Sequence, residues 1–208
     1  MSVADTEFVV RSIAQTVVDH EKEFGDLDAV AGDGDFGYSL ARGFEKVLED
    51  WDSYDRADSG TFLRKVGMTI TSKIGGTSGP IWGTAFLRAA KAAEGQEIDG
   101  VVTVAMLRAA VEGIQKRGGA ELGDKTLIDA IVPANDALEK AVGSGTTGPE
   151  GARPFAQAAR KAAEETSELQ ARRGRASYTG ERSKGSPDAG AMAVAIIAEE
   201  LTTRWNER

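Results

Sequence analysis

DTEFVVRSIAQTVVDHEKEFG, residues 5–25, is the part of the chain that first indicates its fold. The apolar residues in it are separated by four or seven positions, at Val9, Ile13, Val17 and Phe24. Residues at such intervals lie on the same face of an α-helix. The spacing therefore predicts an amphipathic helix over residues 5–24, with Gly25 as the residue that ends it.

The same spacing recurs along the rest of the chain and predicts seven more helices. They cover residues 40–51, 62–74, 82–90, 104–114, 127–142, 155–169 and 192–201. Pro133 should kink the helix that contains it. No stretch alternates apolar and polar residues as a strand does. We therefore expect an all-α fold, a single-domain antiparallel barrel or bundle of about eight amphipathic helices over residues 1–208. The linker-like stretch 143–151 is too short to demand a domain boundary.

Composition excludes several kinds of site and partner. The chain has no cysteine and one histidine, so any metal ion must be held by oxygen ligands. Its 25 Lys and Arg against 33 Asp and Glu give a net charge of −8, which repels nucleic acid unless the basic residues gather on one face. No apolar run is long enough to cross a membrane, and the first residues lack the basic region of a signal peptide. We expect a cytoplasmic protein that binds neither nucleic acid nor membrane.

Glycine is abundant, and its placement points to one end of the bundle. The chain has 25 glycines, roughly 12% of its residues where about 7% is usual. In an antiparallel bundle, loops that follow odd-numbered helices lie at one end. Those loops combine Gly with Asp, Ser, Thr, Lys or Arg, and they cover residues 27–37, 75–80, 117–126 and 172–190. The other loops are ordinary connectors, so we expect a binding site at the end that holds the first set.

The loop LDAVAGDGDFG, residues 27–37, brings Asp28, Asp33 and Asp35 within a few positions of each other. Three carboxylates so close repel unless a cation that prefers oxygen, such as Mg²⁺, lies between them. A solvated acidic turn is the alternative, because Asp and Gly are common in turns. GDGDFG also matches G-x-G-x-x-G, but no strand precedes it, so we do not expect a dinucleotide fold.

Two other loops suit anions. GGTSGP, residues 75–80, offers backbone N–H groups and the hydroxyls of Thr77 and Ser78 where a helix begins, although a tight turn between packed helices explains it equally well. The last loop is cationic, with Arg172, Arg173, Arg175, Arg182 and Lys184. A solvated basic loop is the ordinary interpretation. An acidic and a basic loop at one end instead suit a metal-nucleotide and phosphoryl transfer.

GGAELGDKT, residues 118–126, is not a Walker A motif, because Asp124 separates Gly123 from Lys125. Asp124 suits the N-cap of the helix that follows. The single histidine, His20, is expected within the first helix, away from these loops, as a packing or surface residue.

Taken together, the motifs resemble a known family, the nucleotide-binding L subunit of dihydroxyacetone kinases. They are LDAVAGDGDFG, RGFEKV, GGTSGPIWGT, GDKTLID, GRASYTGERS and PDAGA, in the family's order and spacing over essentially the whole chain. The resemblance implies a barrel of eight antiparallel helices and a phosphotransferase. It also implies ADP or ATP held at one end through two Mg²⁺ ions.

The resemblance assigns site residues. The metal-binding positions are Asp28, Asp33 and Asp35. The nucleotide-binding positions are Phe36, Gly37, Tyr38, Ser39, Thr77, Ser78, Gly118, Leu127, Arg175, Asp188, Ala189 and Gly190. Arg175 is also expected to stabilise the charge of the transferred phosphoryl group. Phe36 stands where members that work with the sugar phosphotransferase system typically have His, and Ser39 where they have Asn.

In the family, a separate K subunit or domain holds the ketose, so we expect activity only with a K-type partner. A phosphotransferase-system phosphocarrier is a further expected partner, because one branch of the family rephosphorylates a bound ADP. Two alternatives stay open. One is an ATP-dependent kinase subunit for a related ketose such as erythrulose. The other is a nucleotide-dependent regulator that binds a transcription factor and transfers nothing.

Overall fold

The computed structural model describes residues 1–146 and 148–208 and contains no β-strand in those ranges. Its α-helices are α1 (Val3–Asp19), α2 (Glu21–Asp28), α3 (Phe36–Glu49), α4 (Ser59–Lys73), α5 (Ser78–Ala92), α6 (Gly100–Gly118), α7 (Ile128–Gly143), α8 (Ala152–Glu165) and α9 (Ala189–Asn206). Short 3₁₀ segments are η1 (Trp51–Ser53), η2 (Gly148–Gly151), η3 (Thr166–Glu168) and η4 (Arg175–Ser183). The all-α prediction is confirmed. Among the described residues, no helix is both long and apolar enough to cross a membrane.

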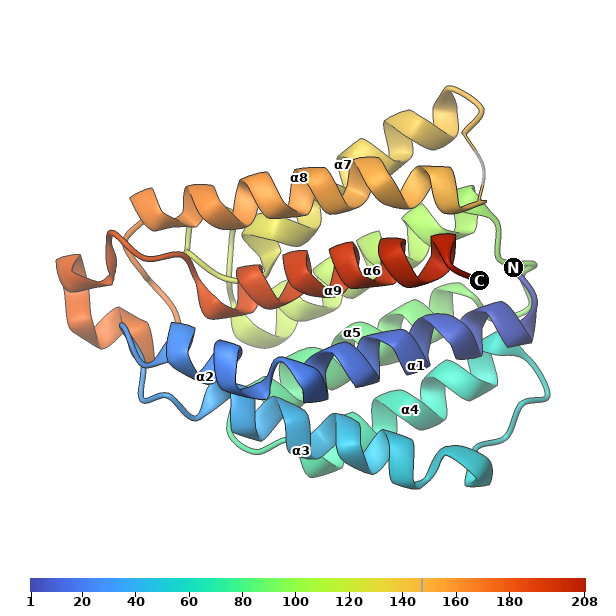
Figure 1. The fold of residues 1–208 in the computed structure, drawn as a ribbon, viewed down its shortest axis with the longest axis horizontal. Helices are drawn as coiled ribbons and strands as arrows, with labels where there is room; N and C mark the ends of the chain where they lie inside the picture. The colour runs from blue at the N-terminus through green and yellow to red at the C-terminus, as the bar shows by residue number, and fades with distance from the viewer. Residues whose placement is uncertain (147) are drawn as a thin grey trace.

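The helices close into a barrel. Each long helix packs on the next along the chain from α3 to α9, while α1 packs on both α3 and α9 and so joins the two ends of the series. The helices run roughly along the long axis of the molecule, and both termini lie at the same end (Figure 1). The connections therefore alternate between the end with the termini and the opposite end.

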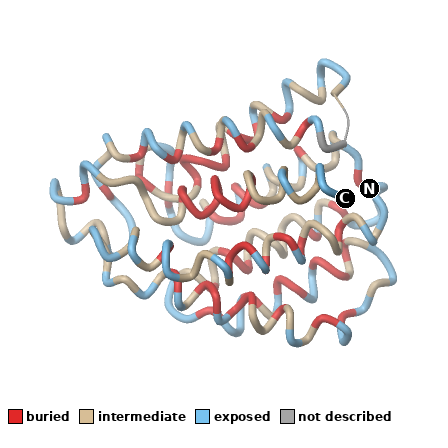
Figure 2. Tube along the Cα trace, viewed as in Figure 1, coloured by how far each residue is buried: buried red, intermediate tan, exposed pale blue. Residues whose placement is uncertain are grey.

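The core lies where the helices face each other. Its largest fully buried side chains include Phe24, Phe44, Phe62 and Ile70. Every residue from Ala191 to Ala198 of α9 is buried, so this helix is apolar all round in its first half. Figure 2 shows the buried residues gathered on the inward faces of the helices. A rigid apolar frame thus holds the loops at both ends.

The prediction that Gly25 ends the first helix is wrong. The helix instead breaks at His20, and α2 continues through Gly25 to Asp28. Gly25 and Gly37 allow α2 and α3 to approach closely, because a Cβ at Gly37 would lie 2.0 Å from the carbonyl oxygen of Glu21 and 2.6 Å from the nitrogen of Gly25. Glycine is needed here for backbone packing between two helices rather than for helix termination.

A smaller difference concerns the length of one helix. The helix predicted over residues 155–169 ends at Glu165, where the 3₁₀ turn η3 follows and tightens the chain. Helix α7 contains Pro133 and continues on both sides of it. In the stretch 143–151, Gly143 is the last residue of α7, and residue 147 lies outside the described residues.

Candidate functional site

The four glycine-rich loops lie together at the end of the barrel opposite the termini (Figure 1). The guanidinium of Arg175, in the last of these loops, forms ion pairs with Asp33 and Asp35 of the first, with 3.4 Å between Arg175 Nη2 and Asp35 Oδ2. The same loop is tied to the third one by Arg173, whose Nε donates to Asp124 Oδ2 at 2.8 Å. Segments far apart in the sequence therefore build one surface.

Asp28, Asp33 and Asp35 form an acidic cluster in which each places one carboxylate oxygen within 4.8 Å of the others. Asp28 is partly buried, whereas Asp33 and Asp35 are exposed. Carboxylate oxygens are hard ligands, and at this spacing they suit Mg²⁺. The residues present therefore fit a divalent cation, and in this structure the guanidinium of Arg175 supplies the compensating charge.

The loop that follows α2 folds back over Asp28. The N–H groups of Gly34 and Phe36 point at Asp28 Oδ2, at 2.9 and 3.4 Å. Gly34 has φ +77°, and a Cβ at Gly32 would lie 2.2 Å from Asp28 Oδ1. Glycine at both positions lets the backbone close around the carboxylate, so the loop orients Asp28 toward the other two aspartates.

The first turn of α3 presents backbone more than side chains to the loop end. The ring of Phe36 is partly buried and lies 6.2 Å from the ring of Phe24, centroid to centroid. Tyr38 is 59% exposed, with the guanidinium of Arg42 5.1 Å from its ring centroid. The side chain of Phe36 is therefore a packing residue, and its N–H faces the loop.

The start of α5 is similarly open. Thr77 is the N-cap residue and Ser78 the first helical residue, and within the described chain the side chain of Thr77 forms no capping hydrogen bond. A Cβ at Gly79 would lie 2.2 Å from the carbonyl oxygen of Ile74, so the turn is tight. Gly118 at the end of α6 lies beside Ile81 of α5, since its Cβ would be 3.1 Å from Ile81 Cδ1.

The interpretation of Asp124 as an N-cap is wrong. Helix α7 begins at Ile128 with Leu127 as its N-cap residue. Asp124 is buried, and its Oδ2 accepts hydrogen bonds from Arg173 Nε and, at 3.0 Å, from the N–H of Glu121. The hydrogen bond from Arg173 holds the pKa of Asp124 below its usual value. Its carboxylate joins two loops instead of capping a helix.

Sequence reasoning missed Lys125, which lies buried beneath the site with φ +63°. Its Nζ donates to the carbonyl oxygens of Thr166 at 2.9 Å and Ser186 at 2.6 Å. Burial lowers the pKa of Lys125, and nearby Asp188 acts in the opposite direction. The ammonium group connects three segments of the loop end. Helical periodicity carries no signal for it, because Lys125 lies in a loop and its partners are backbone atoms.

Asp188 starts α9 next to Lys125. Its Oδ2 accepts from the N–H of Ala191 at 2.8 Å, and its own N–H donates to Thr166 Oγ1 at 2.8 Å. Burial raises the pKa of Asp188 to about 7, while the Ala191 hydrogen bond and the Lys125 ammonium act in the opposite direction. Gly190 lies against Leu127, since its Cβ would be 3.5 Å from Leu127 Cβ.

Most positions that the resemblance assigns therefore fall on the loop-end surface. The metal positions lie together, Arg175 contacts two of them, and Leu127, Asp188 and Gly190 form a second group. Ala189 is the first residue of α9, and Ser39 lies in the first turn of α3.

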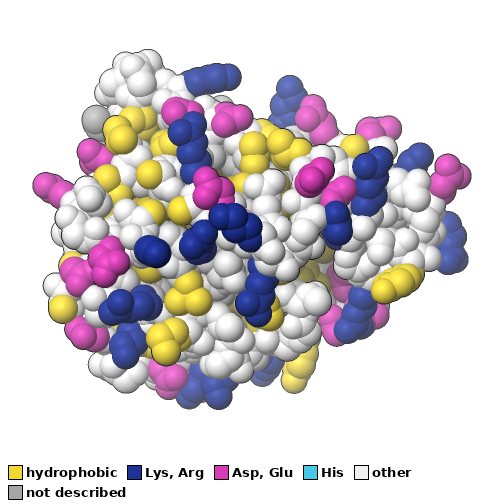
Figure 3. Space-filling view, turned by 180° about the vertical axis from the view of Figure 1, so that it is seen from behind, with side chains coloured by type: hydrophobic (Ala, Val, Ile, Leu, Met, Phe, Trp, Pro, Cys, Tyr) yellow, Lys and Arg dark blue, Asp and Glu magenta, His cyan; other side chains and the backbone are white. Residues whose placement is uncertain are grey.

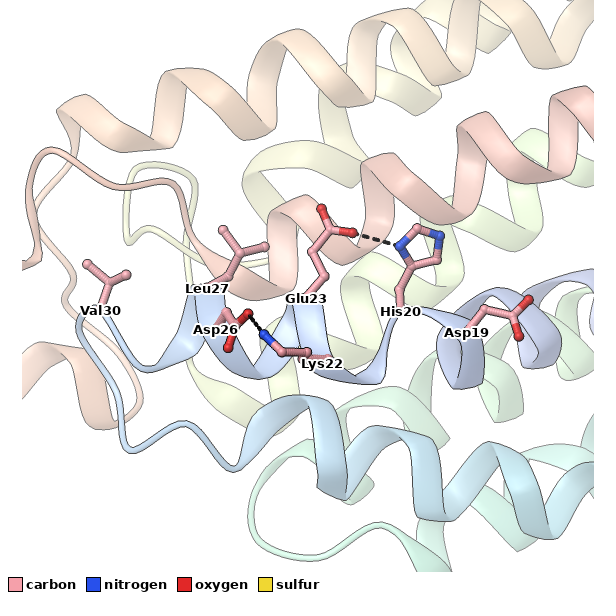
Figure 4. Close-up of a pocket in the computed structure, with 7 residues that line it drawn as sticks. All are labelled: Asp19, His20, Lys22, Glu23, Asp26, Leu27 and Val30. Atoms are coloured by element: carbon pink, nitrogen blue, oxygen red, sulfur yellow. Dashed lines mark hydrogen bonds and ion pairs between the residues drawn. The ribbon is translucent and has the colours of Figure 1, made fainter.

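His20 lies at the junction of α1 and α2 rather than within one helix. Its Nδ1 is 2.7 Å from Glu23 Oε2, and its ring stacks on Phe24. The side chains of His20 and Glu23 line a pocket of about 520 Å³ beside α2 (Figure 4). Its other lining residues are Asp19, Lys22, Asp26, Leu27 and Val30. The three clustered aspartates do not line this pocket, so His20 belongs to a separate surface.

The profile of the DAK2 domain matches residues 30–203. The chain belongs to the DAK2 domain family. This DAK2 chain is 40% identical over 182 residues to the Escherichia coli K12 PEP-dependent dihydroxyacetone kinase, ADP-binding subunit DhaL, with 87% of each chain covered. It is 35% identical over 188 residues to the corresponding subunit of kinase 1 of Listeria innocua, with 90% of this chain and 89% of the relative covered.

Longer proteins share the same domain. The DAK2 chain is 39% identical over 196 residues to the L-erythrulose 1-kinase of Mycolicibacterium smegmatis, covering 93% of itself and 34% of that enzyme. A crystal structure of the dihydroxyacetone kinase from C. freundii in complex with AMP-PNP and Mg²⁺ is similar with a TM-score of 0.79 and 25% identity, over 97% of this chain and 34% of that one.

Proposed function

We propose that this chain is the nucleotide-binding subunit of a dihydroxyacetone or related short-chain ketose kinase, and that a separate K subunit holds the ketose. The observation that carries the proposal is the acidic cluster beside Arg175, at the end of the barrel where open helix N-termini gather. The relatives named as ADP-binding subunits support it, because they match this chain over nearly its whole length.

Asp28, Asp33 and Asp35 would hold Mg²⁺, and we propose two ions. Magnesium would supply positive charge between the carboxylates and the phosphate oxygens of ADP or ATP. Asp28 is the best oriented of the three, because the folded-back loop holds its carboxylate through two N–H groups. The three side chains would thus bind and orient the metal.

The nucleotide would lie across the starts of α3, α5 and α9. N–H groups at a helix N-terminus bind phosphate, because they point outward and carry the positive end of the helix dipole. The proposed contacts are Phe36, Gly37, Tyr38, Ser39, Thr77, Ser78, Gly118, Leu127, Arg175, Asp188, Ala189 and Gly190. At Phe36 the contact would come from the backbone, because its ring packs on Phe24.

Arg175 would change partners during binding. Its guanidinium pairs with Asp33 and Asp35 in this structure, and a metal ion at the cluster would compete for those carboxylates. A released guanidinium can hold two phosphate oxygens in fixed geometry and stabilise the charge of the transferred group. Arg175 would therefore exchange its carboxylate partners for phosphate oxygens when a metal-nucleotide binds.

Titration calorimetry with ADP, with and without Mg²⁺, tests the site. We expect Mg²⁺ to strengthen ADP binding by about tenfold or more, because the clustered carboxylates otherwise repel the phosphates. Equal affinity in excess EDTA would overturn the metal assignment. No binding of ADP under either condition would overturn the nucleotide site.

Reconstitution tests the reaction. We propose that the phosphoryl donor is a phosphotransferase-system protein acting on bound ADP, since relatives carry the names PEP-dependent and PTS-dependent. The chain is mixed with a K-type subunit and dihydroxyacetone or erythrulose. Excess ATP is then compared with phosphoenolpyruvate plus the phosphotransferase proteins. Robust turnover on ATP alone would overturn the donor and leave the site standing. Ketose phosphorylation by the isolated chain would overturn the two-subunit mechanism.

The erythrulose kinases among the relatives support a second candidate substrate, and the same mixtures compare the two ketoses. A regulator that transfers nothing would bind ADP and remain inactive in every mixture.

A further inference from the structure

Helices α4, α5 and α6 lie side by side and form a basic surface, here called the α4–α6 wall. Together they contain eight Lys or Arg and one acidic residue, Glu112, a net charge of +7. The whole chain carries −8, so the remainder carries −15. Figure 3, seen from behind, shows a group of Lys and Arg side chains near the middle of the visible face, with some Asp and Glu side chains beside it. Basic residues are therefore concentrated on these three helices.

Most basic residues of the wall form no ion pair. Within the described residues, Arg108 pairs with Glu139 of α7, and none of the other seven forms an ion pair. Elsewhere in the described chain, most Lys and Arg side chains form ion pairs with Asp or Glu, as Lys22, Lys46 and Arg160 do. A minority, which includes Arg11 and Arg153, form none. An acidic protein has ample partners for its cations, so the wall keeps its charge available to another molecule.

Helix dipoles explain part of this arrangement. Lys73, Lys91, Lys116 and Arg117 lie in the last turns of their helices, where a cation is favourable without any partner. Arg64, Lys65 and Arg88 lie outside the last turns and need another explanation. These three side chains are therefore the ones that indicate a docking surface.

Arg88 is held in place across two helices. A Cβ at Gly113 of α6 would lie 2.5 Å from Arg88 Cγ, so the arginine stem crosses α6 where glycine leaves room. Arg64 and Lys65 are exposed on α4, and Met68 on the same helix is 56% exposed. Val101 of α6 is 64% exposed. Apolar side chains such as Met68 beside arginine are typical of a surface that binds protein.

We propose that the α4–α6 wall docks an acidic face of another protein, apart from the nucleotide site at the loop end. Charge complementarity favours an acidic partner, and the exposed Met68 and Val101 favour a protein over a polyphosphate backbone. An extended nucleic acid would also come close to the rest of the chain, and its net charge of −15 repels phosphate groups. A second copy of the chain would have to bind its acidic side to this wall, a head-to-tail arrangement that generates rings or open chains instead of a twofold dimer.

The test compares two triple variants with equal change in net charge. The wall variant carries Arg64→Glu, Lys65→Glu and Arg88→Glu. The matched control carries Lys22→Glu, Arg153→Glu and Lys161→Glu, exposed residues on α2 and α8. The probe is a short poly-L-glutamate peptide, measured at low salt by fluorescence anisotropy. We expect the wall variant to lose about tenfold or more in affinity and the control about twofold.

Several outcomes would overturn the proposal. They are absence of poly-L-glutamate binding to the unchanged protein, equal losses in both variants, or tighter wall-dependent binding of duplex DNA or of phosphatidylglycerol vesicles. Sedimentation that shows wall-dependent self-association would overturn it in favour of a second copy. Circular dichroism and Mg-ADP titration check that both variants are folded. If the Glu variant is unfolded, the corresponding Gln substitutions replace it. Failure of ADP binding in the unchanged protein would concern the nucleotide site alone.

Discussion

Helices α1, α4 and α6 begin at the end of the barrel that holds the termini, and each has a side-chain cap. Ser2, Asp58 and Asp99 accept hydrogen bonds from backbone N–H groups of the first turn. Helices α3, α5 and α7 begin at the opposite end, and in the described chain their N-cap residues form no side-chain capping bond. Among the described helices that begin there, α9 alone has a side-chain cap, which Asp188 provides. Helix α8 begins at the end with the termini without one, because its N-cap residue is Gly151.

The two ends of the barrel therefore differ in how far side chains stabilise the helix starts and in which groups remain for a ligand. A side-chain cap contributes about 1 kcal/mol to a helix, so three helices at the loop end forgo that stabilisation. The positive dipole ends of these helices gather where the acidic cluster and Arg175 also lie. Some of their first N–H groups bond to the adjoining loops, as that of Phe36 does to Asp28 and that of Ile128 to Thr126. The end with the termini is built to hold the helices, and the loop end leaves groups available to an anionic ligand.

The largest effect is expected at the acidic cluster. Asp33→Asn keeps the shape of the side chain and removes its charge, so Mg²⁺-dependent ADP affinity should fall by about 100-fold or more. The control is Asp26→Asn, an exposed residue nearby that pairs with Lys22. Calorimetry should show little change for the control, and circular dichroism should show intact helices in both. Similar affinities for the two variants would contradict the metal assignment.

Two helical glycines should respond to alanine in opposite directions. Gly37→Ala places a Cβ against the backbone of α2, and we expect a loss of about 2 to 3 kcal/mol in the free energy of unfolding. At Gly143 no atom lies within 4 Å of the added Cβ, so Gly143→Ala should stabilise by up to about 1 kcal/mol. Urea unfolding measures both. Equal effects would mean that α2 and α3 do not pack as described.

Arg175 and Arg182 provide a comparison within the basic loop. Arg175→Lys should lower phosphoryl transfer by about tenfold, because an ammonium group cannot reproduce the guanidinium fork. Arg182→Lys should leave transfer within about twofold. Steady-state rates in the reconstituted mixture decide between them. If Arg182→Lys loses activity and Arg175→Lys keeps it, the wrong arginine has been assigned.

Asp188 should make the stability of the loop end depend on pH. Because burial raises its pKa from 3.8 to about 7, the folded state binds a proton more tightly than the unfolded state. This contribution to stability is present below pH 4 and is lost as the pH rises to 7. Asp188→Asn keeps an N-cap and does not titrate. Urea unfolding of both proteins at several pH values should show the unchanged protein losing stability relative to the variant across that window. Parallel pH profiles would contradict the raised pKa.

Local features of the chain were readable from the sequence. The helix expected over residues 62–74 coincides closely with α4, and that over residues 192–201 lies within α9. Asp28, Asp33 and Asp35 could be grouped because they belong to one short loop. Apolar spacing and turn composition act over a few residues, so they are visible without knowledge of the rest of the fold.

By itself, the sequence determined that the chain is helical and that its glycine-rich loops alternate with plain connectors. The packing of the helices into a closed barrel decided which distant residues meet at the site. It brought Arg175 to Asp33, placed Lys125 under carbonyl groups from two other segments, and required glycine at position 37. It also gathered the basic residues of three helices on one wall. Such contacts join residues far apart in the chain, so they depend on how the helices pack and not on any local pattern.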